Sequence, residues 1–320
     1  MSKIPVIIDT DPGHDDTFAI MMALASDKLE VKAVTTVCGN STVENTTKNA
    51  LNILSLFGRT DIPVAMGRGD PMLGKLDREG GKRVHGESGL EGPVFPPPLF
   101  DMVDMNAVDL IAKIIKESEQ KIVLAPLGPL CNIAAFILSY PELLGRIEMI
   151  SMMGGNTFAG NVTPGAEYNV YVDPESAQVV FQSGIPIVMH GINSVQLGRV
   201  YDKDVEEWRG FHNKAGKLAD ELMEFYTIYS KKTGRKSYCI CDAHAVAYLI
   251  DPSIYTTVCT HVEVDLCGQY TRGRTVADLR DEFTRKLNGA ADKADNCHVV
   301  TDVDSDRFVA LLTESIRTLG

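Results

Sequence analysis

The sequence lacks the features that mark secreted, zinc-binding and membrane proteins. Its seven cysteines lie scattered from Cys38 to Cys297 and include no CxxC pair, so neither a disulfide framework nor a structural zinc site is expected. No apolar run approaches the ~20 residues that cross a bilayer, and Asp9 follows the N-terminal MSKIPVII too early for a signal peptide. We therefore expect a cytoplasmic protein without a membrane segment.

Basic residues are also in deficit. The 320-residue chain has 31 Lys and Arg against 43 Asp and Glu, which gives a formal net charge of -12. Nucleic-acid binding depends on clustered cations that neutralise phosphates, so a nucleic-acid partner is not expected. The hydrophobic fraction of 44% and the charged fraction of 23% are those of an ordinary globular protein with a large core.

Short apolar runs alternate with helical segments along the chain. The predicted strands are residues 4–8, 31–37, 122–126, 147–153 and 185–189, and the predicted helices are residues 15–25, 43–57, 131–140 and 174–183. Residues 205–250 are expected to be helical and residues 257–266 to form a strand. The alternation predicts one α/β domain over residues 1–320, with an open, mostly parallel, Rossmann-like sheet flanked by helices. Ligands bind such sheets beyond the carboxyl ends of the strands.

Residues 67–98 interrupt this pattern. They include eight glycines and five prolines among 32 residues, which is typical of a long surface loop. We interpret the segment as a lid or as a contact between subunits.

Four carboxylates follow the first predicted strand. Asp9, Asp11, Asp15 and Asp16 lie within eight residues, around a Pro-Gly pair. Like charges this close repel, so either some of these groups are protonated or a cation holds them. Oxygen ligands suit Ca²⁺ or Mg²⁺. Capping of the following helix explains one of these aspartates better than four.

The motif formed by residues 9–16, DTDPGHDD, resembles the N-terminal signature of the inosine-uridine-type nucleoside hydrolases. Further motifs follow in the order and approximate spacing of that family, from residue 4 to about residue 255. They are Asn40 in TTVCGN, GPLCN at residues 128–132, MGG at 153–155, NVTPGAEYN at 161–169, DPE at 173–175, and Asp242 before AVAYLIDP. The resemblance implies hydrolysis of the N-glycosidic bond of purine or pyrimidine ribonucleosides to ribose and free base, in nucleoside salvage or catabolism.

The resemblance also implies a role for each matched residue. One calcium ion per subunit would be held by Asp11, Asp16, the main-chain carbonyl of Leu127 and Asp242, and Asp11 would be the base that activates water. The residues that would bind the 2′- and 3′-hydroxyls are Asp15, Asn40 and Asn169, and those on the 5′-hydroxyl side are Met153, Asn161 and Glu167. A homodimer or homotetramer is implied as well.

The group that protonates the departing base is left open. Cys241 occupies the position where the best-known branch of the family has a histidine, so the chain resembles a branch with cysteine at that position. Cys239 lies two residues before it, and these two are the one pair of cysteines close enough in sequence to take part in chemistry together. His244, three residues on at a predicted helix start and so on the same helix face as Cys241, is one alternative to Cys241 as the catalytic acid. His85, in a loop that resembles the family's HGxxGLxG motif, is the other. The aromatic residues Phe225, Tyr226 and Tyr229 either stack on the base or belong to the core.

Two other functions compete with nucleoside hydrolysis. A magnesium-dependent phosphatase of the haloacid-dehalogenase type also has a DxD motif after its first strand, but a β-branched residue should follow the second Asp, and here Pro12 does. A non-catalytic nucleoside- or ribose-binding protein is the second alternative. Retention of all four calcium ligands implied by the resemblance argues against it.

Overall fold

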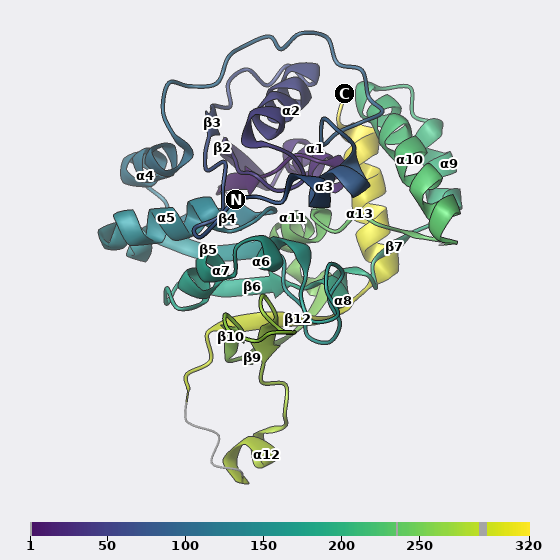
Figure 1. Ribbon diagram of the computed structural model, residues 1–320. Coiled ribbons are helices and arrows are strands. Elements are labelled where there is room, and N and C mark those ends of the chain that lie inside the picture. Colours follow the sequence, from purple (N-terminus) through teal and green to yellow (C-terminus); the bar gives the residue numbers. More distant parts are fainter. Residues whose placement is uncertain (1, 235, 288–292) are drawn as a thin grey trace.

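The computed structural model describes residues 2–234, 236–287 and 293–320, and its centre is an eight-stranded sheet (Figure 1). In spatial order its strands are β3 (Val64–Met66), β2 (Leu29–Thr36), β1 (Ile4–Thr10), β4 (Ile122–Pro126), β5 (Ile147–Met153), β6 (Ile187–His190), β12 (Cys297–Val303) and β9 (Tyr255–Thr260). All neighbours pair in parallel except β12 and β9, which are antiparallel. The predicted open, mostly parallel α/β sheet is therefore confirmed.

Successive residues of β1 contact opposite cores, because side chains alternate along a strand. Val6 and Ile8 pack into one buried cluster and Ile7 into the other. The first cluster is completed by α1 (His14–Ala25), α2 (Val43–Leu56), α9 (Asp202–Arg209), α10 (Lys214–Thr233), α11 (Ala243–Ile250) and α13 (Ser305–Thr318). The second is completed by α4 (Ala107–Glu117), α5 (Cys131–Ser139) and α7 (Pro174–Phe181). Burial on both faces explains the continuous apolar runs of β1 and β4.

The five predicted strands correspond to β1, β2, β4, β5 and β6. The region predicted as helical, residues 205–250, contains most of α9, then α10 and α11, with the short strand β8 (Tyr238–Cys239) between the last two. The predicted strand at residues 257–266 divides into the end of β9 and β10 (Val262–Val264), which pairs with β11 (Thr275–Ala277). The sequence patterns did not reveal β12 and α13, which complete the sheet and its cover.

The Gly/Pro-rich segment at residues 67–98 contains α3 (Arg78–His85). Gly81 packs against the main chain of Asn40, and His14 Nε2 lies 2.8 Å from the carbonyl oxygen of Glu91. The segment thus lies against the loops that follow β1 and β2. Its role as a lid or as a contact between subunits stays a prediction.

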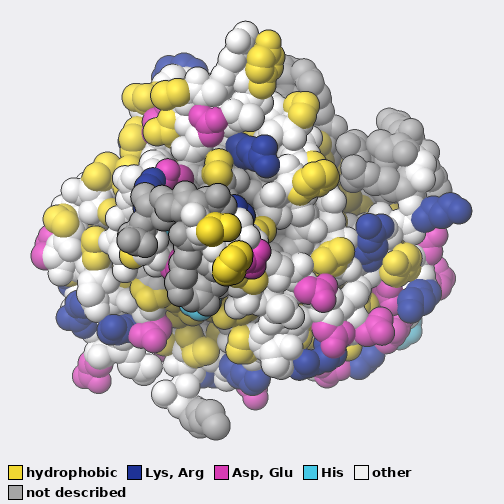
Figure 2. All heavy atoms as spheres, turned by 90° about the horizontal axis from the view of Figure 1, so that it is seen from below, with side chains coloured by type: hydrophobic (Ala, Val, Ile, Leu, Met, Phe, Trp, Pro, Cys, Tyr) yellow, Lys and Arg dark blue, Asp and Glu magenta, His cyan; other side chains and the backbone are white. Residues whose placement is uncertain are grey.

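One end of the molecule carries α12 (Glu282–Leu287), and Figure 2 looks onto that end. Hydrophobic side chains are scattered over this face between charged ones (Figure 2). Phe283 of α12 is 74% exposed and Tyr270, before β11, is 81% exposed. Among the described residues, no helix combines the length and apolar character that crossing a membrane requires.

Candidate active site

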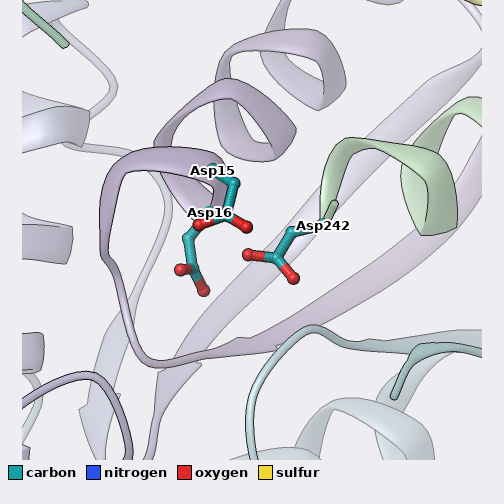
Figure 3. A group of neighbouring side chains, drawn as sticks. All are labelled: Asp15, Asp16 and Asp242. Atoms are coloured by element: carbon teal, nitrogen blue, oxygen red, sulfur yellow. The ribbon is translucent and has the colours of Figure 1, made fainter. Parts of the chain in front are cut away.

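Carboxylates from three parts of the fold converge at the carboxyl ends of the central strands. Asp11 directly follows β1, Asp15 and Asp16 lie in the first turn of α1, and Asp242 directly precedes α11. The side chains of Asp15, Asp16 and Asp242 point into one common space (Figure 3), and their ligand oxygens lie within 4.8 Å of one another. We call Asp11, Asp15, Asp16 and Asp242 the acidic cluster.

The loops around the acidic cluster hold two of its carboxylates in fixed orientations. Asp16 accepts hydrogen bonds from Thr10 Oγ1 at 2.5 Å, from the Gly13 amide at 2.9 Å and from Asn40 Nδ2 at 3.1 Å. The Asn40 amide donates to Asp11 Oδ2 at 2.7 Å. Asp16 thus caps α1 through the Gly13 amide, as expected for one aspartate of the motif. Asp9 lies outside the acidic cluster and accepts hydrogen bonds from Thr35 Oγ1 and Asn132 Nδ2.

Two glycines permit the close packing of loops around Asp11. A β-carbon at Gly39 would collide with Asp11 Oδ2, and one at Gly128 would collide with Oδ1 of the same carboxylate. These glycines follow β2 and β4, the two neighbours of β1 in the sheet. Any larger residue at either position would displace the Asp11 carboxylate from the cluster.

The acidic cluster is electrostatically strained without a cation. Burial raises the pKa of Asp11 well above its usual value, and repulsion by Asp16 adds to the rise. Loss of hydration, followed by repulsion from Asp16, raises the pKa of Asp15 to about 7. Burial and then the charges of Asp15, Asp16 and Asp11 raise the pKa of Asp242. Since no Lys or Arg of the described residues forms an ion pair with these groups, a hard divalent cation fits the set.

A cavity of about 440 Å³ opens beside the acidic cluster. Eleven of the residues singled out from the sequence line it: Asp11, Asp15, Asn40, His85, Leu127, Met153, Asn161, Glu167, Asn169, Cys241 and Asp242. Asp16 lies behind this wall, fully buried and bonded to Asn40. His244 is the one predicted catalytic residue that the structure does not bring to the cavity or the cluster.

The side of the cavity opposite α1 is built by the loop after β5 and by α6 (Tyr168–Val172). Glu167 accepts hydrogen bonds from the amides of Gly155 at 2.8 Å and Asn169 at 2.9 Å, and burial raises its pKa. Asn169 Nδ2 donates to the carbonyl oxygens of Leu127 at 2.7 Å and Met153 at 3.1 Å. These bonds join the ends of β4 and β5 to α6.

Sequence reasoning assigned no role to several residues that line the cavity. Tyr168 lies between two predicted residues, Glu167 and Asn169, and its hydroxyl donates to the Gly39 carbonyl at 2.6 Å, which joins α6 to the loop after β2. Ile192 comes from α8 (Ile192–Val195), Gln196 directly follows α8, and Tyr238 comes from β8. Only the position of Tyr168 inside the NVTPGAEYN motif offered a signal.

His85 lines the cavity as part of a histidine pair. Its Nδ1 lies 3.1 Å from Nδ1 of His14, whose ring stacks on Phe225 at a centroid distance of 4.5 Å. Burial lowers the pKa of His85 to about 4 and that of His14 to about 3, so both rings are neutral at pH 7. Phe225 therefore packs on a histidine, whereas Tyr226 lines the cavity; the Tyr229 side chain lies outside the described residues.

The prediction that His244 shares a helix face with Cys241 is corrected by the structure. Helix α11 begins at Ala243, so Cys241 precedes it and the i, i+3 relation does not apply. The His244 ring is fully buried, stacks on Phe308 at a centroid distance of 3.7 Å and lies with Nδ1 3.0 Å from the Tyr255 hydroxyl. His244 is thus a packing residue of the core.

Replacing His244 is expected to affect stability much more than catalysis. His244→Ala removes a ring stacked on Phe308 and leaves the Tyr255 hydroxyl without its partner, which should cost about 2 kcal/mol or more of unfolding free energy. We expect kcat of the folded variant to stay within about threefold of the parent. Denaturant melts and ribose-release assays test this, with exposed His298→Ala as the matched control. A thousandfold loss of kcat in a stable variant would return His244 to the catalytic residues.

Cys241 lines the cavity, as predicted, with its sulfur 2.7 Å from Cys239 Sγ. The hydrogen bond with Cys239, together with burial, raises the pKa of the Cys241 thiol well above its usual value, so the thiol stays protonated at neutral pH. A thiol is a weak hydrogen-bond donor, and we therefore expect Cys241→Ala to lower kcat less than about tenfold. Steady-state kinetics of ribose release measure this. A loss above ~10³ with unchanged KM would assign protonation of the base to Cys241.

Comparison with known proteins agrees with this geometry. Residues 6–310 match the family model described as inosine-uridine preferring nucleoside hydrolase, a match that includes β12 and the start of α13. The chain is 43% identical over 314 residues to the pyrimidine-specific ribonucleoside hydrolase RihA of Photobacterium profundum, with 98% of each chain covered. It is 42% identical over 316 residues to RihA of Escherichia coli O1:K1, again with 98% of each covered.

Solved structures resemble the whole fold. A purine-preferring ribonucleoside hydrolase from Gardnerella vaginalis superposes with a TM-score of 0.90 at 32% identity, with 98% of each chain covered. The plant nucleoside hydrolase PpNRh1 superposes with a TM-score of 0.91, also at 32% identity, with 99% of each chain covered.

Proposed function

Because the chain belongs to the inosine-uridine preferring nucleoside hydrolase family and is a ribonucleoside hydrolase, we propose that it works with a calcium ion in the acidic cluster and prefers pyrimidine ribonucleosides. The observation that carries the proposal is the convergence of Asp11, Asp15, Asp16 and Asp242 at one end of the cavity. A buried group of four carboxylates is stable at neutral pH only when protons or a cation neutralise it.

The chemistry of the donor atoms supports calcium. The residues that would hold the ion are Asp11, Asp16, Asp242 and the Leu127 carbonyl, all of which offer oxygen, the ligand that calcium prefers. When bound, the ion supplies positive charge that orients sugar hydroxyls and makes a nearby water easier to deprotonate. Asp11, whose carboxylate packs between Gly39 and Gly128, is the residue we propose to take that proton.

The remaining polar residues of the cavity would bind the sugar. Asp15, Asn40 and Asn169 are proposed to hold the 2′- and 3′-hydroxyls. The Asn169 nitrogen is already engaged by Leu127 and Met153, which leaves its oxygen to accept from a hydroxyl. Met153, Asn161 and Glu167 are proposed to enclose the 5′-hydroxyl.

Negative charge around the sugar also favours the transition state. Cleavage of an N-glycosidic bond builds positive charge on the ribosyl ring, which carboxylates and polar oxygens stabilise. A rate acceleration of ~10¹⁰ requires about 14 kcal/mol, more than a single side chain supplies. The proposed mechanism therefore divides this energy between ribose binding, water activation by Asp11 and departure of the base. Two candidates to protonate that base line the cavity: Cys241, whose thiol keeps its proton, and His85, whose ring is neutral at pH 7 and has to take up a proton before it donates one.

The preference for pyrimidines rests on the relatives at 42–43% identity, which are named pyrimidine-specific. The purine-preferring structure is more distant, at 32% identity. Tyr226, Tyr238 and Gln196 line the cavity and are the residues we propose for the base. Tyrosine rings stack on either class of base, so the choice of class depends on the hydrogen bonds that the base edge makes.

One set of assays tests the proposal. The protein is incubated with uridine, cytidine, inosine, adenosine and p-nitrophenyl phosphate, with EDTA or with added calcium, and free ribose and phosphate are measured. We expect ribose from uridine and cytidine at least tenfold faster than from inosine, with loss on chelation and recovery with calcium. Faster ribose release from inosine than from uridine would overturn the proposed pyrimidine preference. Unchanged rates in EDTA would overturn the proposed dependence on calcium. No phosphate release is expected from a member of this family, so p-nitrophenyl phosphate serves as the negative control.

We further infer that the protein is a homodimer or homotetramer and acts in the cytoplasm. The exposed side chains of Phe283 and Leu287 in α12 give apolar contact area at the end of the molecule that carries this helix. Light scattering coupled to gel filtration tests the oligomer, and a monomer at micromolar concentration would contradict it. Cell fractionation tests the compartment.

A further inference from the structure

Cys239 and Cys241 face each other on the wall of the cavity. Ile240 between them is fully buried, so the two cysteines project to the opposite side of this extended segment. Their sulfur atoms lie 2.7 Å apart, both side chains are partly exposed, and both line the cavity. A small molecule that enters the cavity can therefore reach both sulfurs.

The other cysteines lack this combination of contact and access. All seven are among the described residues and all are free thiols. Cys38, Cys131 and Cys297 are buried, whereas Cys259 and Cys267 are exposed. Cys38 hydrogen-bonds to Cys131, but solvent reaches neither of them. Cys239 and Cys241 alone combine sulfur contact with an accessible position.

We propose that Cys239 and Cys241 form a reversible disulfide in the wall of the active site and that this modification stops hydrolysis. A disulfide bond is about 2.05 Å long, so the sulfurs need to approach by only about 0.7 Å from their separation of 2.7 Å. Rotation about the two Cα–Cβ bonds achieves an approach of this size. The oxidation is a reaction distinct from hydrolysis of the nucleoside.

The oxidant is a low-molecular-weight disulfide such as oxidised glutathione. The Cys239 thiol loses its proton to water and its sulfur attacks the reagent, which forms a mixed disulfide and releases one glutathione thiolate. Cys241 then loses its proton and attacks the Cys239 sulfur, which closes the protein disulfide and releases the second thiolate. The protein loses two protons and two electrons, and the reagent gains them as two molecules of glutathione.

The new bond would disturb hydrolysis through two neighbours. Asp242, which lies in the acidic cluster, directly follows Cys241, and the preferred C–S–S–C angle near 90° forces both cysteine side chains to rotate. The disulfide also removes the Cys241 thiol proton and alters the wall opposite His85. The effect on turnover rests on the proposed function, whereas formation of the disulfide does not.

Mass spectrometry tests bond formation without any activity assay. Cleavage before Asp242 and after Lys236 yields the peptide of residues 237–241, SYCIC, which holds only these two cysteines. After treatment with oxidised glutathione and iodoacetamide, we expect this peptide to lack two hydrogen atoms and to carry no alkyl group. Two alkyl groups, or a glutathione adduct that persists on one cysteine, would overturn the proposal.

Ribose release then tests the consequence, with each protein compared with its own reduced form. Oxidation should lower the rate of the parent at least tenfold, and dithiothreitol should restore it. Cys239→Ser and, independently, Cys241→Ser should lose this response, while the control Cys259→Ser on the exposed side of β9 should keep it. A closed SYCIC disulfide without loss of rate would overturn the regulatory role. If the reduced parent releases no ribose, the proposed function fails while the peptide mass still decides the disulfide.

Discussion

Asp11→Asn is expected to lower kcat for ribose release by about 10³-fold and, in the absence of metal, to raise the melting temperature. The variant keeps the size of the side chain and an oxygen that can accept from the Asn40 amide, but it removes a metal-binding charge and the proposed base. In the cation-free protein the same charge is buried and repelled by Asp16, which is why its pKa is raised. Its removal should therefore relieve repulsion.

A pair of measurements on one variant separates function from structure here. Steady-state kinetics with calcium give the loss of kcat, and calorimetry in EDTA gives the melting temperature. Asp27→Asn, an exposed aspartate just beyond α1, is the matched control and should change neither. If Asp11→Asn melted lower than the parent in EDTA and retained its kcat, the carboxylate would be a structural residue and the proposed base would be wrong.

Calcium is expected to stabilise the protein and to reduce its dependence on pH. A free calcium concentration about a thousandfold above Kd should add about 4 kcal/mol to the unfolding free energy, because only the folded chain assembles the acidic cluster. Without the ion, stability should fall between about pH 6.5 and pH 8, where the buried carboxylates lose their protons. Thermal melts at both pH values, with EDTA or with calcium, measure both effects.

The direction of this pH effect follows from the pKa shifts of the buried carboxylates and histidines, which have opposite signs. Burial raises the pKa of Asp9 to about 7, and loss of hydration raises that of Asp15 to about 7, from the usual 3.8. Their stabilising contribution is complete below about pH 4 and is lost as the pH rises through 7. Burial lowers the pKa of His14 and His85 from 6.5 to about 3 and 4, so their contribution is lost only as the pH falls below 6.5.

Above about pH 6.5 the carboxylates alone decide whether the unfolding free energy rises or falls with pH. Calcium replaces protons in the acidic cluster but not at Asp9, which is bonded to Thr35 and Asn132 instead. With calcium bound, the unfolding free energy should therefore still fall as the pH rises, but by less than in EDTA. Greater stability of the EDTA-treated protein at pH 8 than at pH 6.5 would contradict the repulsion among these carboxylates.

The family motifs identified most of the site because they place chemically distinctive residues at strand ends. Parallel strands end at the same edge of a sheet, so Asp11, Asn40 and Leu127 had to lie near one another once β1, β2 and β4 were adjacent. Met153 ends β5 and reaches the same cavity for the same reason, whereas Glu167 and Asn169 are brought there by α6, which follows the loop after β5. The Asp11→Asn variant tests the role of Asp11, and the roles of the other residues stay predictions.

Prediction from the sequence was wrong where the position of a side chain depends on the residue at which a helix begins. His244 was expected beside Cys241 on one helix face, but α11 begins two residues after Cys241, and the His244 ring packs on Phe308 of α13. Helix boundaries shift by a residue or two with little local signal. The contact between Cys239 and Cys241 likewise depends on how β8 leads into α11, and spacing alone could not establish it.

By itself, the sequence determined the strand and helix types, the parallel α/β class, and the oxygen-rich character of the site, because apolar periodicity and residue chemistry are local properties. Tertiary structure decided which distant segments meet: Asp242 beside Asp15 and Asp16, β12 between β6 and β9, and residues 67–98 against the loop after β1. These contacts join residues far apart in the chain, and they form only when burial of the shared cores outweighs the entropy of closing long loops.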